Sequence, residues 1–142
     1  MALDVFSDAW AAAWAKELNA SDAFRVAALK WESAFVFVMQ SDLDAGVKEP
    51  RAVFVDLSKG ECRAGRAATG EDLEHAVYVL QASPAVWRQV LGGDLEPVGA
   101  LMTGLMDLSR GSLVGLAPWV GAAKELLNAA CRVESCYPEN LA

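Results

Sequence analysis

Apolar residues near the N-terminus recur with helical spacing. Trp10, Trp14 and Leu18 lie four residues apart, so they fall on one face of an α-helix, and Ser7 stands before the first turn as a suitable N-cap. Alanine, the best helix former, fills most of the positions between them. We therefore expect two N-terminal helices, from Asp8 to about Leu18 and from Asp22 to about Lys30.

The pattern then changes to that of β-strands. The segment 32–40 is rich in β-branched and aromatic residues and is apolar at both alternating positions, which predicts a central strand that is covered on both faces. The segments 51–57 and 61–68 flank a short turn that ends in Gly60, as expected for a β-hairpin. A fourth strand is predicted from His75 to Leu80.

The stretch from Gly92 to Ala130 is strongly apolar but is broken by glycines and prolines. It has more large apolar side chains than one short helix can bury, so it either supplies much of the core or lines a cavity. We expect one helix that begins at Pro84 and ends before Gly92, a short helix from Pro97 to Met102, a fifth strand at 106–108 and a last helix from about Pro118 to Cys131. This order of elements predicts an α+β domain.

Length and charge narrow the class of protein. The 142 residues suit a single domain, 1–142, with N-terminal helices in 1–30 and a polar tail in 132–142. The net charge of −7 disfavours nucleic acid as a partner and leaves at most transient contact with a membrane. The charge-free run 111–123 is too short to span a bilayer, and the acidic N-terminus is unlike a secretory signal. Three cysteines without a CxxC pair are expected to be reduced thiols of a cytoplasmic protein.

Three blocks of the chain, taken in order, resemble the sterol carrier protein 2 family. The block 53–60 is similar to that family's strand ending in Asp before a glycine turn, 93–97 is similar to its Gly-Lys-Met/Leu-Asn/Asp-Pro helix start, and 102–111 is similar to its Gly-Lys-Leu-x-Ile/Leu-x-Gly strand and turn. The resemblance runs from about residue 51 to residue 130. It implies a five-stranded, mostly antiparallel sheet packed by helices around an apolar tunnel, with lipid carriage and neither chemistry nor a cofactor.

The chain also departs from the family at several positions. Asp94 and Leu105 stand where the family often has lysine, and Glu74-His75 replaces an Ala-Asp pair. These differences imply an apolar ligand with little need for a cationic clamp. The chain ends Glu-Asn-Leu-Ala, without the Ser-Lys-Leu type of peroxisomal address of eukaryotic members.

The candidate wall of the tunnel consists of large apolar residues from the predicted strands and C-terminal helices. The alternative role of each is ordinary core packing. The set is Phe35, Phe37, Met39, Val77, Val79, Leu101, Met102, Leu105, Leu116, Trp119 and Leu127. Arg51, Arg63 and Arg66 either meet an anionic head group or are solvated charges that protect a sheet edge.

The leading hypothesis is non-catalytic carriage of a fatty acyl, sterol-like or isoprenoid lipid by a monomer or homodimer. One alternative is an accessory enzyme acting on a hydrophobic substrate with His75, Asp107 or Glu125 as general base. The sequence has no GxSxG motif for a serine nucleophile and no cluster of metal ligands, and nothing in it brings Cys62 to His75 as a thiolate pair. The other alternative is a dimerising interaction module without a cavity.

Overall fold

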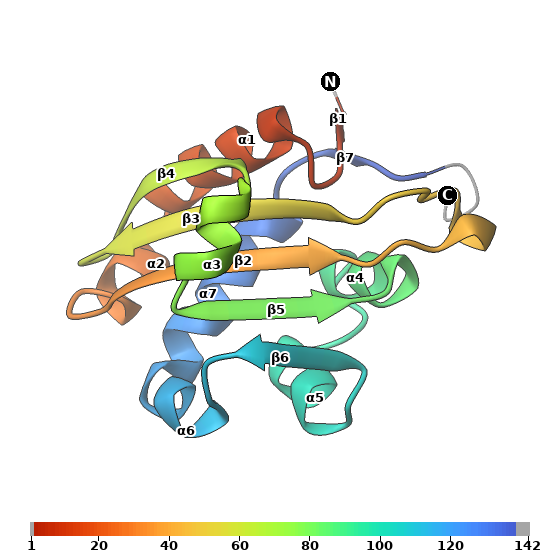
Figure 1. The fold of residues 1–142 in the computed structure, drawn as a ribbon. Coiled ribbons are helices and arrows are strands. Elements are labelled where there is room, and N and C mark those ends of the chain that lie inside the picture. The colour runs from red at the N-terminus through yellow and green to blue at the C-terminus, as the bar shows by residue number, and fades with distance from the viewer. Residues whose placement is uncertain (1, 139–142) are drawn as a thin grey trace.

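The computed structural model describes residues 2–138, so the predicted C-terminal tail is described as far as Pro138 and the Glu-Asn-Leu-Ala terminus lies outside the described residues. Helices and strands are interspersed along the chain (Figure 1). The helices are α1 (Asp8–Asn19), α2 (Asp22–Ala27), α3 (Gly70–His75), α4 (Pro84–Leu91), α5 (Pro97–Met102), α6 (Leu113–Leu116) and α7 (Val120–Cys131), with the 3-10 turns η1 (Leu43–Ala45) and η2 (Ala117–Trp119). The strands are β1 (Leu3–Asp4), β2 (Glu32–Met39), β3 (Arg51–Ser58), β4 (Glu61–Ala67), β5 (Tyr78–Ala82), β6 (Met106–Arg110) and β7 (Ser135–Cys136).

Five of the strands form one sheet in the order β4-β3-β2-β5-β6. Every neighbouring pair is antiparallel except β2 and β5, which run parallel. Phe35, near the middle of β2, is paired with Val55 of β3 on one side and with Tyr78 of β5 on the other. The prediction of an α+β domain with a five-stranded, mostly antiparallel sheet is therefore confirmed.

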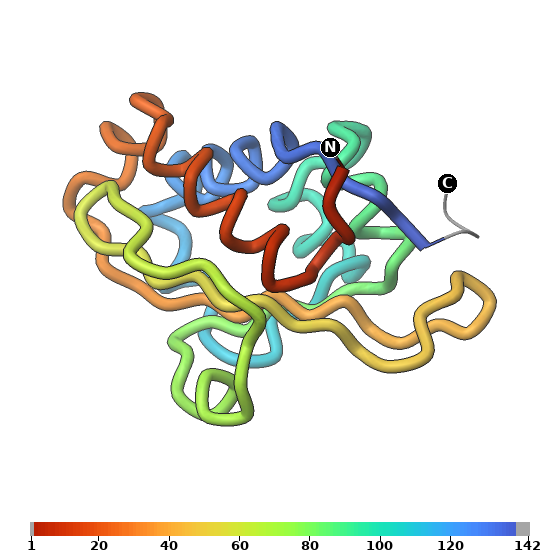
Figure 2. Tube along the Cα trace, turned by 90° about the horizontal axis from the view of Figure 1, so that it is seen from above, coloured from red at the N-terminus to blue at the C-terminus, as the bar shows by residue number. Residues whose placement is uncertain are grey.

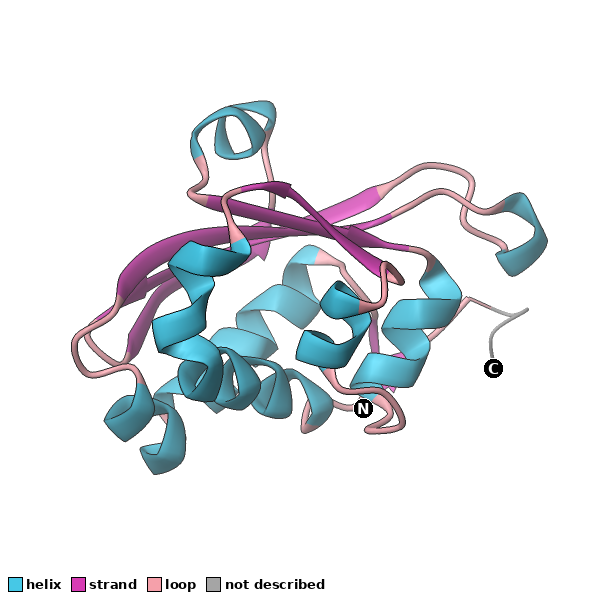
Figure 3. Cartoon of the chain, turned by 90° about the horizontal axis from the view of Figure 1, so that it is seen from below, coloured by secondary structure: helices cyan, strands magenta, loops and turns pink. Residues whose placement is uncertain are grey.

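Most of the helices lie on one face of this sheet. Figures 2 and 3 show α1, α4, α5 and α7 together on that face and α3 alone on the other. Phe35 and Phe37 of β2 point into the larger core under the helices, whereas Val36 is buried in a small cluster with Ala76 and Val79 on the opposite face. The central strand is thus buried on both faces, as its apolar pattern predicts. No helix among residues 2–138 is long and apolar enough to cross a membrane.

Helix α1 closes the edge of the sheet at β4. Its two ends bond the outer backbone of that strand: the Ala67 amide donates to Asp8 Oδ1 at 2.9 Å, and the Asn19 side chain exchanges hydrogen bonds of 2.8 and 3.0 Å with the Cys62 backbone. These bonds satisfy backbone groups that an exposed edge would offer to another chain. Gly65 makes the close approach possible, because a Cβ there would lie 2.5 Å from the Ala11 carbonyl oxygen.

Three further contacts join the C-terminal part of the chain to the N-terminal part. Strands β1 and β7 pair in parallel, with Leu3 opposite Ser135. The Trp10 indole N–H donates to Ser135 Oγ at 2.8 Å, and the Trp14 indole N–H donates to the Leu126 carbonyl at 2.9 Å. The segment after α7 therefore belongs to the fold as far as β7. The polar character of this segment did not indicate that two of its residues would pair with β1.

The predicted fourth strand begins too early. Residues 70–75 form α3 instead, and the strand β5 starts only at Tyr78, so His75 is the last residue of a helix. The helix is short and has no buried residue, so it lacks the apolar periodicity by which helices are detected. Its N-terminal signal is a capping box, in which Thr69 and Asp72 satisfy each other's backbone N–H groups.

Other boundaries differ by a few residues. Helix α2 ends at Ala27 rather than near Lys30, and β6 continues to Arg110. The last helix is preceded by α6 and η2, so the α-helix proper begins at Val120 rather than at Pro118. Helix ends are where sequence patterns have least information, because the last turn depends on capping and tertiary contacts.

The packing of α1 on β4 generates a testable prediction. Gly65→Ala is expected to lower the free energy of unfolding by about 1–3 kcal/mol, because the new methyl group meets the backbone of α1 and the helix must shift. Gly121→Ala is the matched control: nothing lies within 4 Å of its Cβ position, and alanine favours the helix by up to about 1 kcal/mol. Urea unfolding followed by tryptophan fluorescence measures both changes. Equal stability of Gly65→Ala and the parent protein would contradict the prediction.

Candidate functional site

An apolar pocket lies between the sheet and the C-terminal helices. Its volume is about 400 Å³, and Phe35 and Phe37 of β2 with Leu80 of β5 line it on the sheet side. The other lining residues come from α5, α6, η2, α7 and the residue before α5, and all but Glu96 and Lys124 are apolar. They are Glu96, Pro97, Val98, Leu101, Met102, Leu113, Leu116, Ala117, Val120, Ala123, Lys124, Leu126 and Leu127.

The local sequence explains how these elements present their side chains to the pocket. On α7, Val120, Ala123 and Leu127 recur at i, i+3 and i+7, so they share the helix face that looks toward the sheet. Helix α5 begins with Pro97 at its first position, where the missing N–H costs nothing, and Ser112 caps α6 through the Gly115 amide. The side of the pocket opposite the sheet is therefore built from short separate helices and the start of α7.

The mouth of the pocket is bordered by exposed apolar side chains. Met102 of α5 is 76% exposed, and Leu113 and Val120 are also well exposed. The two charged lining residues, Glu96 and Lys124, are also exposed to solvent. The pocket is thus apolar inside, while its few charged groups stand where they remain hydrated.

The structure brings six of the eleven predicted wall residues to this pocket: Phe35, Phe37, Leu101, Met102, Leu116 and Leu127. It places the other five elsewhere. Met39 is fully buried in the core, and Leu105 is half-exposed in the turn before β6. Val77 is exposed, Val79 packs in the small cluster beyond the sheet, and Trp119 lines a neighbouring pocket.

The positions of Val77 and Val79 follow from the alternation of β5. Successive side chains of a strand point to opposite faces, and it is Tyr78 and Leu80 that face the helices. All four residues from 77 to 80 are apolar or aromatic, so the hydrophobic pattern does not indicate which pair faces inward. The register with β2 decides it, because Phe35 is paired with Tyr78 and Phe37 with Leu80.

Sequence reasoning missed several lining residues, chiefly Val98, Leu113, Ala123, Lys124 and Leu126. The helical spacing of Val120, Ala123 and Leu127 was a signal that could have found part of this group. The resemblance to the family did not predict Lys124 as a lining residue, because the positions where the family often has lysine hold Asp94 and Leu105 in this chain. Asp94 and Leu105 themselves do not line the pocket.

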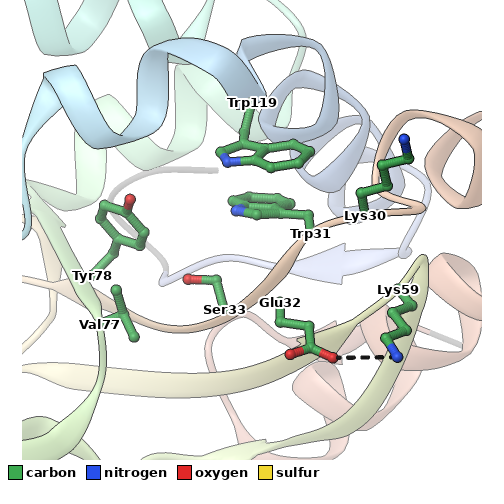
Figure 4. A pocket seen from close by; sticks show the side chains of 8 residues that line it. All are labelled: Lys30, Trp31, Glu32, Ser33, Lys59, Val77, Tyr78 and Trp119. Carbon is green, nitrogen blue, oxygen red and sulfur yellow. Dashed lines mark ion pairs between the residues drawn. The ribbon is translucent and has the colours of Figure 1, made fainter.

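A second pocket, of about 540 Å³, adjoins the first at the start of β2 (Figure 4). Its lining consists of four polar residues, three aromatic residues and one valine: Lys30, Glu32, Ser33 and Lys59, then Trp31, Tyr78 and Trp119, and Val77. Phe35 separates the two spaces, because its ring stacks on Tyr78 at 4.9 Å and meets Trp31 at 5.4 Å while it also lines the apolar pocket. Gly111 and Gly115 leave room for the Tyr78 ring, which a Cβ at Gly111 would approach to 2.3 Å.

The three arginines of the hairpin each have a partner away from both pockets. Arg51 donates to the Val5 carbonyl at 3.0 Å. Arg63 lies 3.8 Å from Asp56, and Arg66 bonds Asp72 at 2.8 Å with its guanidinium over the Phe54 ring. They therefore contribute to the sheet edge and do not line either pocket.

The candidate general bases are not brought together. His75 ends α3 beyond the far face of the sheet, Asp107 lies on the edge strand β6, and Glu125 is on α7. None of the three lines the apolar pocket.

Cys62 is a buried thiol on β4, and Cys62, Cys131 and Cys136 are all free. Its Sγ donates to the Ala64 carbonyl at 3.2 Å. Burial, helped by the nearby Asp56 carboxylate, raises the pKa of Cys62 to about 11, so the thiol is protonated at neutral pH. A protonated thiol is a poor nucleophile, which argues against a thiolate pair with His75.

The five-stranded sheet with its helices on one face and an apolar pocket between them defines a small α+β fold, and solved structures share it. A crystal structure of sterol carrier protein 2 is 42% identical, with a TM-score of 0.84, over 92% of this chain and 99% of the other. The solution structure of a conserved hypothetical protein of Thermus thermophilus, named as a candidate sterol carrier protein, is 41% identical, with a TM-score of 0.83, over 94% and 92% of the two chains.

This chain belongs to the sterol carrier protein 2 family. The apo form of sterol carrier protein 2 from Yarrowia lipolytica shares the fold, with a TM-score of 0.58 at 16% identity over 85% of this chain and 88% of that one. No protein-family model and no curated protein sequence matches the chain.

The raised pKa of Cys62 predicts a loss of stability at high pH. The unfolded thiol ionises near 9 and the folded thiol near 11, so between these values the unfolded state binds fewer protons and the free energy of unfolding falls as pH rises. The full loss is about 3 kcal/mol, and most of it develops between pH 9 and pH 11. Cys62→Ser, whose hydroxyl does not ionise in this range, should lack this component. Urea unfolding of both proteins at pH 8 and pH 11 measures it, and parallel pH dependence in the two would contradict the assignment.

Proposed function

We propose that this protein binds and carries a hydrophobic small molecule in the apolar pocket and performs no chemistry on it. The observation that carries the proposal is the composition of the pocket wall, in which Glu96 and Lys124 are the only charged members and every other member is apolar. Ligand pockets for apolar molecules have mainly hydrophobic walls and few polar groups, and volumes of roughly 300–1,000 Å³. The names of the related proteins, which refer to sterol carriage, support the same role.

The energy of such binding comes from removing apolar surface from water. Each methylene that enters contributes about 0.8 kcal/mol. Walls formed by Phe35, Phe37 and Leu127 offer no hydrogen bonds to a ligand body, so affinity depends on apolar contact and fit. A fatty acyl chain, a sterol-like ring system and an isoprenoid all satisfy this condition, because an apolar pocket distinguishes ligands mainly by shape, at about 1–3 kcal/mol per methylene.

The charged groups at the mouth suggest how the ligand is oriented. Lys124 and Glu96 are exposed beside the apolar rim. A polar ligand end placed there stays hydrated, whereas the same end at Phe37 would lose its water without gaining a partner. We therefore expect the apolar part of the ligand to enter first and the polar end to remain at the mouth.

Carriage explains the structure better than catalysis does. The three candidate bases, His75, Asp107 and Glu125, lie on three different elements and none lines the pocket. Dimerisation through the exposed rim at Met102, Leu113 and Val120 is compatible with carriage, since a second copy would cover apolar surface at the mouth. We place the protein in the cytoplasm, which its three free thiols support.

The first prediction concerns binding itself. After delipidation, the protein should bind a fluorescent fatty acid saturably, and protein purified under native conditions should carry a lipid detectable by native mass spectrometry. Ala123→Trp should reduce the affinity at least tenfold, because an indole on α7 occupies the pocket. Ala12→Trp, a change of the same size at an exposed position of α1, is the control and should bind like the parent.

Two results would overturn the proposal. One is the absence of both bound lipid and saturable binding. The other is equal affinity of Ala123→Trp and the parent protein, which would place the ligand elsewhere. Analytical ultracentrifugation of the same samples measures whether the protein dimerises when it binds the lipid.

The second prediction concerns the mouth. Lys124→Gln should weaken fatty-acid binding no more than about fivefold, because an exposed charge contributes about 0–1 kcal/mol, and the loss should shrink as salt is added. Affinity for a fatty alcohol of the same chain length should not change. A loss much larger than fivefold that salt does not reduce would mean that the lysine holds a buried head group instead.

A further inference from the structure

The polar and aromatic pocket at the start of β2 is a second space that the carriage of a lipid does not use. It shares no lining residue with the apolar pocket. Figure 4 shows the rings of Trp31, Trp119 and Tyr78 along one side and the side chains of Ser33, Glu32 and Lys59 along the other. A space with one aromatic side and one polar side fits a molecule that has a flat apolar body and a polar edge.

Ser33 is the residue that points to a ligand. Only 8% of it is exposed, and its Oγ is the one buried side-chain oxygen or nitrogen among residues 2–138 for which the structure gives no hydrogen-bond partner. Buried polar groups are bonded in the large majority of cases, and an unpaired one calls for an explanation. Ser33 lies on the same face of β2 as Phe35 and Phe37, where every other side chain of the strand is apolar. A hydroxyl at this position is costly unless something in the pocket bonds to it.

The aromatic side of the pocket is rigid. Trp31 and Trp119 stack with their ring centroids 5.7 Å apart and their planes within 15°. Tyr78 is fixed by its own stacking on Phe35 and by the close approach of Gly111. Fixed rings offer a flat surface without loss of side-chain freedom, which favours an aromatic ring of a ligand over a flexible chain.

The charges at the open end favour an anion. Lys59 is 3.9 Å from Glu32, so these two largely offset each other, and both are exposed. Lys30 has no ion pair or hydrogen bond within the described part of the chain. The pocket therefore has a net charge of about +1 in a protein whose net charge is −7. One negative charge on a ligand is matched here, and further negative charge is opposed by the rest of the protein.

We propose that this pocket is a binding site for a small aromatic monoanion, such as an aromatic carboxylate. Its ring lies against Trp119 and Tyr78, a polar atom of the ligand bonds Ser33 Oγ, and the negative charge faces Lys30 and Lys59. The site is independent of the lipid pocket, so it stands or fails separately from lipid carriage.

The five tryptophans provide a local measurement of binding. The indole N–H groups of Trp10, Trp14 and Trp87 are each bonded inside the protein, to Ser135 Oγ, the Leu126 carbonyl and the Val38 carbonyl. Trp31 and Trp119 line the pocket. In a titration of 15N-labelled protein with 2-naphthoate, the two pocket indole signals, assigned through Trp31→Phe and Trp119→Phe, should shift saturably while the other three stay in place.

Variants test each part of the proposed contact. Ser33→Ala should weaken 2-naphthoate about 2- to 10-fold, the effect of losing one hydrogen bond, while the exposed Ser41→Ala should have no effect. Lys30→Gln should weaken it a few-fold at low salt, and the neutral 2-naphthalenemethanol should bind more weakly than 2-naphthoate. Ala123→Trp, which fills the lipid pocket, should bind 2-naphthoate like the parent.

Three outcomes would overturn the proposal. The first is no saturable shift of the two pocket signals up to millimolar 2-naphthoate. The second is a shift of the Trp14 indole signal that is absent in Ala123→Trp. Because the Trp14 ring contacts Phe37 of the lipid pocket, such a shift means that 2-naphthoate binds in the lipid pocket. The third is equal binding of 2-naphthoate by Ser33→Ala and the parent protein, which means that the hydroxyl does not bond the ligand.

Discussion

The helical layer of this protein is attached to its sheet through one connected set of aromatic rings. Starting from Phe6, ring contacts of 4.9–5.9 Å link the N-terminal segment, α1, α4, β2, β5 and the residues before α7. The set is Phe6, Trp10, Trp14, Trp87, Phe37, Phe35, Trp31, Tyr78 and Trp119. Each aromatic pair stabilises by about 0.5–1.5 kcal/mol beyond burial, and here successive pairs share members, so moving one ring disturbs several elements. Hydrogen bonds from Trp14 and Trp87 to backbone carbonyls fix the rings further.

The same rings determine where empty space can exist. Phe35 and Phe37 belong to the core and also form one side of the apolar pocket, and Phe35 with Tyr78 closes that pocket toward the second one. The sheet side is therefore fixed by strands and stacked rings. The opposite side consists of α5 and α6, of six and four residues, and of the first turns of α7. Short helices have little stability of their own and depend on tertiary contacts, so this side is the more easily displaced of the two.

The sequence-based predictions are accurate where the signal for an element lies within a few consecutive residues. The structure confirms the elements whose signals are contained in a few residues. These signals are Ser83-Pro84 at the start of α4, the helical spacing of Trp10 and Trp14 in α1, and the apolar residues at both alternating positions of β2. Helix α3 has no apolar stripe, and its cap at Thr69 gave the only indication. The family resemblance added one five-stranded, mostly antiparallel sheet, whereas the strand order and the parallel pairing of β2 with β5 were not predicted.

The pocket was harder to predict than the fold for a physical reason. Whether an apolar residue lines a space or fills it depends on which elements face each other across it. Val79 and Leu80 are equally apolar neighbours, yet only Leu80 lines the pocket, because the register with β2 turns it inward. Ala123 and Lys124 became lining residues only once α7 was placed over the sheet. The orphan hydroxyl of Ser33 has no signature in the sequence at all.

The pairing of β1 with β7 has a consequence for how the protein is made. Leu3 pairs with Ser135 and Trp10 is bonded to the same serine, so these contacts cannot form until residues about 125 positions further along the chain have been synthesised. Helix α7, which covers Phe35 and Phe37, is also synthesised late. Contacts of such large sequence separation slow folding, and until they form the aromatic face of the sheet is exposed to other chains. Until α7 is in place, the face of the sheet that carries Phe35 and Phe37 therefore lacks its helical cover and depends on α7 for its burial.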